Sequence, residues 1–482
     1  MNRLWMPLDW LVKPLSKNPV GQGAFWAGLY LAGLLAWLFF FQSRIDPEFY
    51  RTHDWPKEYK YFSVLQQAVK TGTLPWHTSE KMQPSQPTDR FLAIPESLSL
   101  LAPQTQLLRW MHIKAFVIFN TLLLYTLGTF ALFKLSRHYD FPPAIAAFGF
   151  LIFTLNGHIV SHFSAGHSMW SGYFLLPWVL YLLCTGYSSS FTLRHALYMA
   201  LALAGIVLQG GVHIFIWCLL FLGLLWLTAP WRLRFIWATF IISGLLVLHR
   251  LLPTFITFQP APHLLRGFPS QNDVWGSLIS LSRYRNSLFS WEFDNYISLP
   301  GLLLTACFIA IPVWHRKIHA TAAVLNRSLF PICFFAWCTL RTHWFAIINN
   351  LHIPLLSIER VPSRFLILPL LFTQTIGCIM AQDWLSGIPD GSRKKRILSL
   401  VITPVLLFNF ALLIRHLQIW RMARIEAAAS AMINWQKMPT IVWREDFGYK
   451  ATTLSAWGVS LLTLTAVTIW LILTRKPKVV LS

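Results

Sequence analysis

A polar stretch between two long apolar runs near the N-terminus contains the side chains best suited to acid–base chemistry. Asp54 stands just before Pro56, and Glu58 follows one helical turn later. Apolar residues recur over residues 56–69 with the spacing of one helix face, Pro56 suits a first helical turn, and Gly72 suits the position after a helix end. Asp54 would then cap free N–H groups at the helix start, or act as a general base beside a bound substrate.

Three histidines form a second candidate cluster at the end of a later apolar run. His158 and His162 are four residues apart, which places them on one face of a helix, and His167 follows closely. This spacing occurs in zinc sites, but no carboxylate lies between the first two, as it does in His-Glu-x-x-His. We therefore expect a hydrogen-bonded polar cluster near the membrane interface and assign no metal to these residues.

Two arginines at the entrance to a late apolar run are candidates for binding a phosphate. Arg360 and Arg364 are four residues apart and share a helix face if the helix begins near Pro362. Guanidinium groups bind phosphate through paired hydrogen bonds, yet arginines at a membrane interface also extend their charge toward water without any ligand. Further arginines in a preceding polar loop are weaker candidates: Arg250, Arg266, Arg283 and Arg285.

The composition indicates which elements hold these residues. With 55% hydrophobic and 12% charged residues over 482 positions, the chain is too apolar for a water-soluble protein. Its apolar runs are continuous rather than alternating, which favours helices of roughly 20 residues over barrel strands. We expect an all-α, polytopic membrane protein with about twelve transmembrane helices and with juxtamembrane helices in the first external loop. The expected spans are residues 24–41, 113–135, 144–155, 169–183, 195–208, 212–227, 235–248, 299–314, 329–340, 365–380, 397–414 and 455–473.

These spans divide the chain into parts with different expected environments. The segment 415–450 has apolar residues at helical spacing, so we expect an external amphipathic helix that caps a cavity, docks a partner protein or simply packs on the bundle. The expected parts are a cytoplasmic interfacial segment (1–23), a first span (24–41), an external loop that holds the candidate base (42–112), a transmembrane bundle with external loops (113–414), the external helix (415–450), and a last span with a basic cytoplasmic tail (451–482).

Charge sets the expected orientation. Short loops rich in Lys and Arg lie on the cytoplasmic side of membranes, and this rule places both termini in the cytoplasm. Four aspartates would then lie inside (Asp9, Asp140, Asp383 and Asp390), and the other Asp and Glu residues outside. The expected spans carry no central carboxylate, which disfavours an ion-coupled transporter. The net charge of +22 suits anionic membrane lipids, and no nucleic-acid-binding module is recognisable.

Four stretches in the same order resemble a known family. Asp54, the helix after it and Gly72-x-x-Pro75-Trp76 resemble the first external loop of the GT-C superfamily of membrane glycosyltransferases, in particular its YfhO-like branch. The other stretches that resemble this family are residues 91–96 with 101–103, residues 156–158 with 166–170 and 176–178, and residues 358–365.

The resemblance implies a transferase in a bacterial inner membrane. It would move a sugar from a polyprenyl-phosphate donor to an acceptor on the external, periplasmic face. Asp54 would be the catalytic base, with Glu58 or Asp46 in that role under another alignment, and Arg360 and Arg364 would meet the lipid phosphate. The loop lacks the paired acids of some branches, so the need for a divalent metal stays open.

Two other classes of function fit the same sequence. A non-catalytic scaffold or assembly subunit would keep the architecture without the chemistry, and its interior would be filled by its own aromatic side chains or covered by a partner. A lipid or solute transporter is the third possibility. An open cavity that joins the membrane to Asp54 would favour the enzyme.

Overall fold

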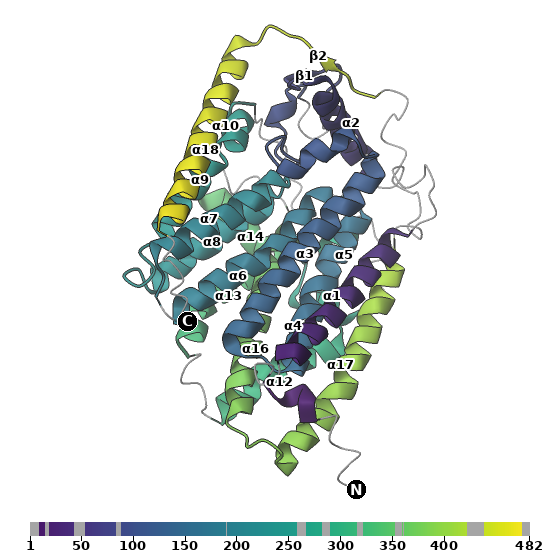
Figure 1. The fold of residues 1–482 in the computed structure, drawn as a ribbon, viewed down its shortest axis with the longest axis vertical. Coiled ribbons are helices and arrows are strands. Elements are labelled where there is room, and N and C mark those ends of the chain that lie inside the picture. The colour runs from purple at the N-terminus through teal and green to yellow at the C-terminus, as the bar shows by residue number, and fades with distance from the viewer. Residues whose placement is uncertain are drawn as a thin grey trace, which may run out of the picture.

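The computed structural model describes residues 9–14, 19–42, 54–82, 88–188, 190–257, 267–281, 290–315, 322–351, 359, 361–421 and 438–474. Helices dominate these residues and pack around one large apolar core. The helices run roughly along one long axis, with α2 (Trp55–Thr71) and a small strand pair at one end and the N-terminus at the other (Figure 1). The all-α architecture expected from the sequence is therefore correct, apart from this strand pair.

Seven helices in the described part of the chain are long and apolar enough to cross a membrane, which makes this a multi-pass membrane protein. A pair of shorter helices, α9 (Ile236–Leu246) and α10 (Leu248–Thr257), would make an eighth span, but it is bent by 69°. The seven are α1 (Pro19–Phe41), α3 (Ile113–Tyr139), α4 with α5 (Pro143–Leu155 and Gly157–Ser164), η6 with α6 (Ser168–Leu175 and Leu176–Ser188), η8 with α16 (Pro362–Leu366 and Ile367–Ser386), α17 (Arg393–Ile419) and α18 (Phe447–Leu473).

The expected number of twelve spans is not confirmed. Four of the expected spans are helices of 16 or 17 residues: α7 (Leu193–Leu208), α8 (Val212–Thr228), α12 (Leu299–Trp314) and α13 (Ala322–Cys338). At 1.5 Å per residue such a helix is about 25 Å long, which is shorter than a hydrocarbon core of roughly 30 Å. Length and composition alone therefore do not show that these helices cross the membrane.

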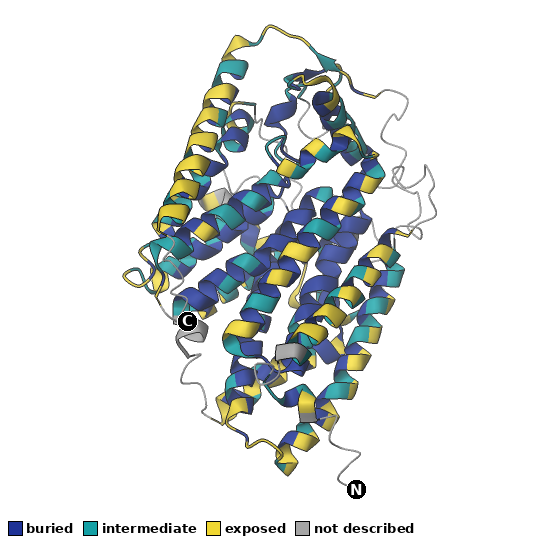
Figure 2. Cartoon of the chain, in the orientation of Figure 1, coloured by how far each residue is buried: buried dark blue, intermediate teal, exposed yellow. Residues whose placement is uncertain are grey.

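Burial separates central helices from peripheral ones. The spans formed by α4 with α5, η6 with α6, and η8 with α16 are 89% buried, whereas α1, α17 and α18 are only 33%, 28% and 17% buried. Figure 2 shows long exposed stripes on α17 and α18. Because these stripes are apolar, lipid would cover them in a membrane. His158, His162, His167 and Arg364 lie at the ends of these buried spans.

The predicted juxtamembrane helix is present as α2. It begins at Trp55, with Pro56 in its first turn, and it ends at Gly72, whose φ of 70° is left-handed. Glycine adopts that conformation without a steric penalty, which explains the sharp stop. The apolar face of α2 is buried, and the helix packs against η5 (Pro103–Arg109). This packing fixes the start of α2 relative to the bundle.

The prediction of a helix over residues 415–450 is wrong for most of the residues that the structure describes in this segment. Helix α17 continues only to Ile419, residues 422–437 lie outside the described part, and Phe447 already begins α18. Between them, β2 (Ile441–Val442) pairs antiparallel with β1 (His77–Thr78). β-Branched residues favour such pairing, and side chains near the strands reinforce it. Arg90 binds Asp446, and Arg444 binds Asp89.

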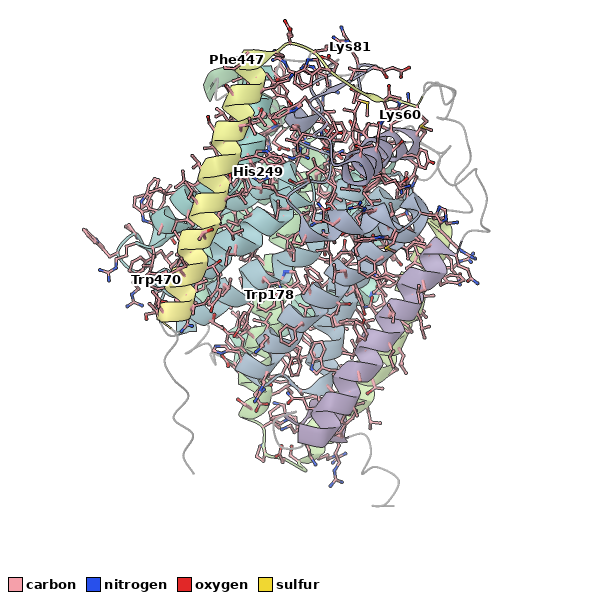
Figure 3. The ribbon with its side chains drawn as sticks, turned by 45° about the horizontal axis from the view of Figure 1, so that its top comes forward. Lys60, Lys81, Trp178, His249, Phe447 and Trp470 are labelled. Carbon is pink, nitrogen blue, oxygen red and sulfur yellow. The ribbon has the colours of Figure 1, made fainter. Side chains whose placement is uncertain are left out.

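The strand pair ties the last helix to the first loop. Figure 3 places Phe447, Lys60 and Lys81 at the same end of the molecule, with Trp470 far along α18. The ring of Tyr449, in the first turn of α18, lies edge-on to His77 at a centroid distance of 5.6 Å. The segment between α1 and α3 therefore packs against both the bundle and the C-terminal helix α18.

A substitution at Gly128 tests how closely α3 packs against η6. A Cβ atom on Gly128 of α3 would lie 2.4 Å from the carbonyl oxygen of Phe174 in η6. We expect Gly128→Ala to lower the free energy of unfolding by about 1–3 kcal/mol through overpacking. Gly458→Ala is the matched control, because no atom lies within 4 Å of its Cβ position in α18. Thermal unfolding in one detergent measures both, and equal midpoints would contradict this packing.

Candidate functional site

Local backbone structure brings Asp54 and His167 together. Asn156 ends α4 and caps α5, where its side chain accepts a hydrogen bond from Ile159 N at 3.3 Å. The chain then turns at Gly166, whose φ is 88° and whose Cβ position would lie 2.4 Å from Trp55 N. Asp54 N donates to Ala165 O at 3.0 Å. Only glycine permits this close approach, which places His167 beside the start of α2.

Asp54 stands at the start of α2, but its side chain does not cap the helix. Its Oδ2 atom lies 3.0 Å from His167 Nε2 and 3.5 Å from Lys57 Nζ. Burial favours a raised pKa, but the charge of Lys57 and the hydrogen bond from His167 outweigh it and hold the pKa of Asp54 well below its ordinary value. The side chain is 41% exposed. Asp54 is therefore an ionised carboxylate that a ligand can reach.

Lys57 lies among three carboxyl groups. Its Nζ atom is 3.3 Å from Glu96 Oε2, 3.5 Å from Asp54 Oδ2 and 3.9 Å from Glu58 Oε1. Burial opposes its charge, but these neighbours raise the pKa of Lys57 well above its ordinary value. Lys57 is therefore charged, and it neutralises part of the negative charge at the start of α2.

Glu58 differs from Asp54 because it is buried. Its side chain is only 2% exposed, and Ser168 Oγ donates a short hydrogen bond to its Oε2 atom. Burial raises the pKa of Glu58 to about 8, against the opposing effects of Lys57 and Ser168. Glu58 is therefore protonated near neutral pH, while Asp54 is ionised. Asp54 and Glu58, the two alternative candidates for the catalytic base, therefore have different protonation states.

A chain of ionisable groups leads away from Lys57 into the bundle. His213 of α8 lies 3.9 Å from Glu96 through Nε2 and 2.8 Å from Glu359 through Nδ1. The carbonyl of Glu359 accepts a hydrogen bond from the indole of Trp344 in α14 (Arg341–Leu351). Sequence reasoning singled out none of Lys57, His213 and Glu359. The only available signal was the general concentration of acids in the loops that the sequence predicts to be external.

The three histidines also meet one another. The ring centroids of His158 and His162 are 4.4 Å apart, and those of His162 and His167 are 5.2 Å apart. All three are buried. Trp170 of η6 fills the space beside them, with its ring edge-on to His158 and His162 at centroid distances of 4.8 Å and 4.6 Å. Trp170 also lies beside Trp217, with ring centroids 5.4 Å apart.

Arg364 already has a carboxylate partner. Its Nε and Nη2 atoms donate to the two oxygens of Glu292 in η7 (Ser290–Phe293), and the pair is buried. His162 Nε2 lies 3.4 Å from the same carboxylate. Burial opposes the charge of Glu292, but Arg364 and His162 hold its pKa well below its ordinary value. A phosphate at Arg364 would have to compete with this pair. Arg360 and Asp46 lie outside the described residues.

These contacts join into one charged network, which extends from Asp54 in two directions. One arm runs through Lys57 to Glu359, and the other runs through His167 to Arg364. Both arms end in the segment that leads into α16. The charged network comprises Asp54, Lys57, Glu58, Glu96, His162, His167, His213, Glu292, Glu359 and Arg364.

A divalent metal does not fit this network as it stands. The oxygens of Asp54, Glu58 and Glu96 are the ligand type that magnesium, calcium and manganese prefer, but they all face the ammonium group of Lys57. In the described part of the chain, no three His, Cys, Asp or Glu side chains have the arrangement of a metal site.

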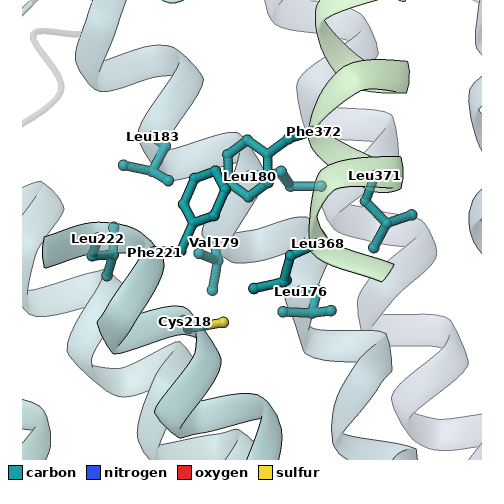
Figure 4. A pocket seen from close by; sticks show the side chains of 10 residues that line it. All are labelled: Leu176, Val179, Leu180, Leu183, Cys218, Phe221, Leu222, Leu368, Leu371 and Phe372. Carbon is teal, nitrogen blue, oxygen red and sulfur yellow. The ribbon is translucent and has the colours of Figure 1, made fainter. Parts of the chain in front are cut away.

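Two apolar cavities lie deeper in the bundle. One is lined only by apolar side chains from α6, α8 and α16 (Figure 4). The rings of Phe221 and Phe372 stack at 4.0 Å on its wall. The second shares Leu180 and Leu371 with the first, and its otherwise apolar lining includes Ser136, Gln374 and Thr375. Neither has Asp54 in its lining, so these cavities do not provide the open route to Asp54 that would favour an enzyme.

No family model, curated protein or solved structure matches this chain.

The pKa of Glu58 gives a pH-dependent prediction. The folded chain holds the Glu58 proton up to about pH 8, whereas the unfolded chain releases it near pH 4.5. Stability therefore falls as pH rises between these values. Glu58→Gln keeps the neutral form, so relative to this variant the wild type should lose about 2 kcal/mol between pH 6 and pH 8. Thermal unfolding at both pH values tests this, and parallel shifts of the two proteins would contradict the buried, protonated Glu58.

The pairing of Arg364 with Glu292 predicts a compensated double variant. Arg364→Gln leaves Glu292 buried without its partner and should cost about 3–5 kcal/mol of stability. Glu292→Gln with Arg364→Gln should recover most of this loss, while Arg393→Gln at the start of α17, an exposed position, should change little. Unfolding midpoints measure the effect. If the double variant is as unstable as the single one, the ion pair is not what Arg364 contributes.

Proposed function

We propose that this protein is a GT-C-like membrane glycosyltransferase that moves a sugar from a polyprenyl-phosphate carrier to an acceptor hydroxyl. The observation that carries the proposal is Asp54, an ionised and partly exposed carboxylate held by Lys57 and His167 at the end of the bundle. A general base must be ionised, reachable and fixed in position. Asp54 meets all three requirements, and its lowered pKa makes it a weaker base than an ordinary aspartate.

The contacts of Asp54 suggest how the transfer would proceed. His167 and Lys57 both contact Oδ2, which leaves Oδ1 to accept the proton of the acceptor hydroxyl. The acceptor oxygen would then bond to the anomeric carbon of the sugar. The bond from that carbon to the phosphate oxygen breaks, and its electron pair leaves with the polyprenyl phosphate. Because Arg364 is bound to Glu292, Arg360 is the arginine we propose for the departing phosphate.

The cellular setting of the proposal comes from charge. The basic short loops favour cytoplasmic termini, so Asp54 would face the periplasm of a bacterial inner membrane. The donor would enter from the lipid bilayer, and the acceptor would enter from the aqueous side. Membrane lipids and the lipid-linked sugar are therefore the proposed partners.

A non-catalytic scaffold is the second candidate, and the aromatic packing favours it. Trp170 and Trp217 occupy the space between the two arms of the charged network, and Arg364 stacks over Trp170 at 5.4 Å. A partner protein would find exposed aromatic side chains on the segment that follows residue 437. Trp443 and Phe447 are 78% and 86% exposed there.

Native mass spectrometry of the purified protein in mild detergent separates the two candidates. We expect one polyprenyl phosphate per wild-type chain. Asp54→Asn should fold normally and hold the carrier with its sugar still attached, because transfer is blocked. Asp273→Asn is the matched control, since Asp273 also lies at a helix start, in α11 (Gln271–Ile279). Bulk phospholipid alone in every variant, together with a tightly held protein, would favour the scaffold.

A further inference from the structure

Three arginines meet where α7 and α9 begin. Arg194 is in the first turn of α7, and Arg232 and Arg234 are in the turn that joins α8 to α9. The two helices start at the same end of the bundle, because Thr239 Oγ1, in the first turn of α9, donates to Ala196 O, in the first turn of α7, at 3.4 Å. We call these three arginines the basic corner.

The helices around the basic corner carry no acid that could neutralise it. The sequence has no Asp or Glu in residues 141–272, which include α7, α8 and α9, or in residues 447–482, which include α18. Helix α18 runs alongside α9 and packs against it (Figure 1). In the described part of the chain, the arginines that form ion pairs with acids are Arg90, Arg364 and Arg444, and none of them belongs to the corner. The basic corner therefore keeps its positive charge at the protein surface.

Aromatic side chains around the basic corner are typical of a membrane interface. Trp231, in the turn between α8 and α9, is 90% exposed. The guanidinium group of Arg194 lies 5.8 Å from the ring centroid of Tyr198. That of Arg234 lies 4.9 Å from the ring centroid of Phe235. Trp and Tyr are enriched where hydrocarbon meets the lipid headgroups, and arginine binds phosphate through paired hydrogen bonds. The corner thus combines two features that suit a phospholipid headgroup.

An exposed apolar stripe continues from the basic corner along α9. Trp237, Ile241 and Leu245 are four residues apart, so they share one helix face, and they are 50%, 61% and 38% exposed. From Trp237 to Leu245 the helix rises about 12 Å, which is close to half of a hydrocarbon core of roughly 30 Å. A water-soluble acidic partner would cover the arginines and leave this stripe bare. A lipid has a headgroup for the arginines and an acyl chain for the stripe.

We propose that the basic corner and the α9 stripe together bind one anionic phospholipid. Its phosphate accepts hydrogen bonds from Arg232 and Arg234, and one acyl chain lies along the stripe. A zwitterionic phospholipid fits less well, because the uncompensated arginines repel the cationic group of its headgroup. This inference rests on the surface of α7, α8 and α9 alone, so it stands whether or not the protein transfers sugars.

Photolabelling of the full-length protein in phosphatidylcholine nanodiscs tests the proposal. Two probes with the same diazirine-bearing acyl chain are compared, one with a phosphatidylglycerol headgroup and one with a phosphatidylcholine headgroup, and peptide mass spectrometry locates the label. We expect the phosphatidylglycerol probe to label residues 231–245 at least about tenfold more than the other probe. Arg232→Gln should lower this labelling about fivefold. Arg232→Gln with Arg234→Gln should lower it to the level of the phosphatidylcholine probe.

Matched variants keep the test decisive. Arg232→Lys retains the charge and should keep most of the labelling, and Arg393→Gln, at an exposed position outside the basic corner, should leave it unchanged. Unfolding midpoints show whether each variant is folded, and Arg234→Gln alone replaces the double variant if that does not fold. Equal labelling by both probes, or undiminished phosphatidylglycerol labelling of the folded variants that lack arginine, would overturn the proposal. Labelling by neither probe would also overturn it and would show that protein covers this face.

Discussion

The need to neutralise buried charge at one end of the bundle governs the rest of this structure. Moving an ionised group out of water costs several kcal/mol, and a single unpaired charge there would destabilise the fold. Each acid of the charged network accordingly has a basic neighbour: Asp54 has Lys57 and His167, Glu58 and Glu96 have Lys57, Glu292 has Arg364, and Glu359 has His213. These pairs join segments that are far apart in the sequence, so they also fix the geometry of the site.

Elements with local signals could be predicted from the sequence. The helix after Asp54, its stop at Gly72 and the long apolar spans follow from periodicity and from the backbone preferences of proline and glycine. The segment before α18 misled the same reasoning, because Ile441 and Val442 pair with strand β1, more than 350 residues earlier in the chain. Periodicity within one segment carries no information about such a distant partner.

The side-chain partners in the candidate site could not be predicted from the sequence for the same reason. The sequence singled out Asp54 and Glu58 as candidate bases and Arg364 as a candidate phosphate-binding residue, but their partners decide what each can do. Arg364 meets Glu292, which lies 72 residues away in sequence. The side chain of Asp54 turns from the helix start toward His167, 113 residues away. Neither partner is marked by spacing, since both contacts exist only once the helices have packed.

The energetics of buried ion pairs bear on the choice between enzyme and scaffold. Replacing such a pair by well-packed apolar side chains is often neutral or stabilising. A protein selected only to hold a partner would therefore gain little in stability from Glu292 with Arg364 or from the three acidic side chains around Lys57. A protein that moves protons needs groups whose pKa values are held apart, and here Asp54 is ionised while neighbouring Glu58 keeps its proton to about pH 8. The aromatic side chains packed around Trp170 favour the scaffold. The difference between the pKa values of Asp54 and Glu58 favours the enzyme, because close packing alone does not require it.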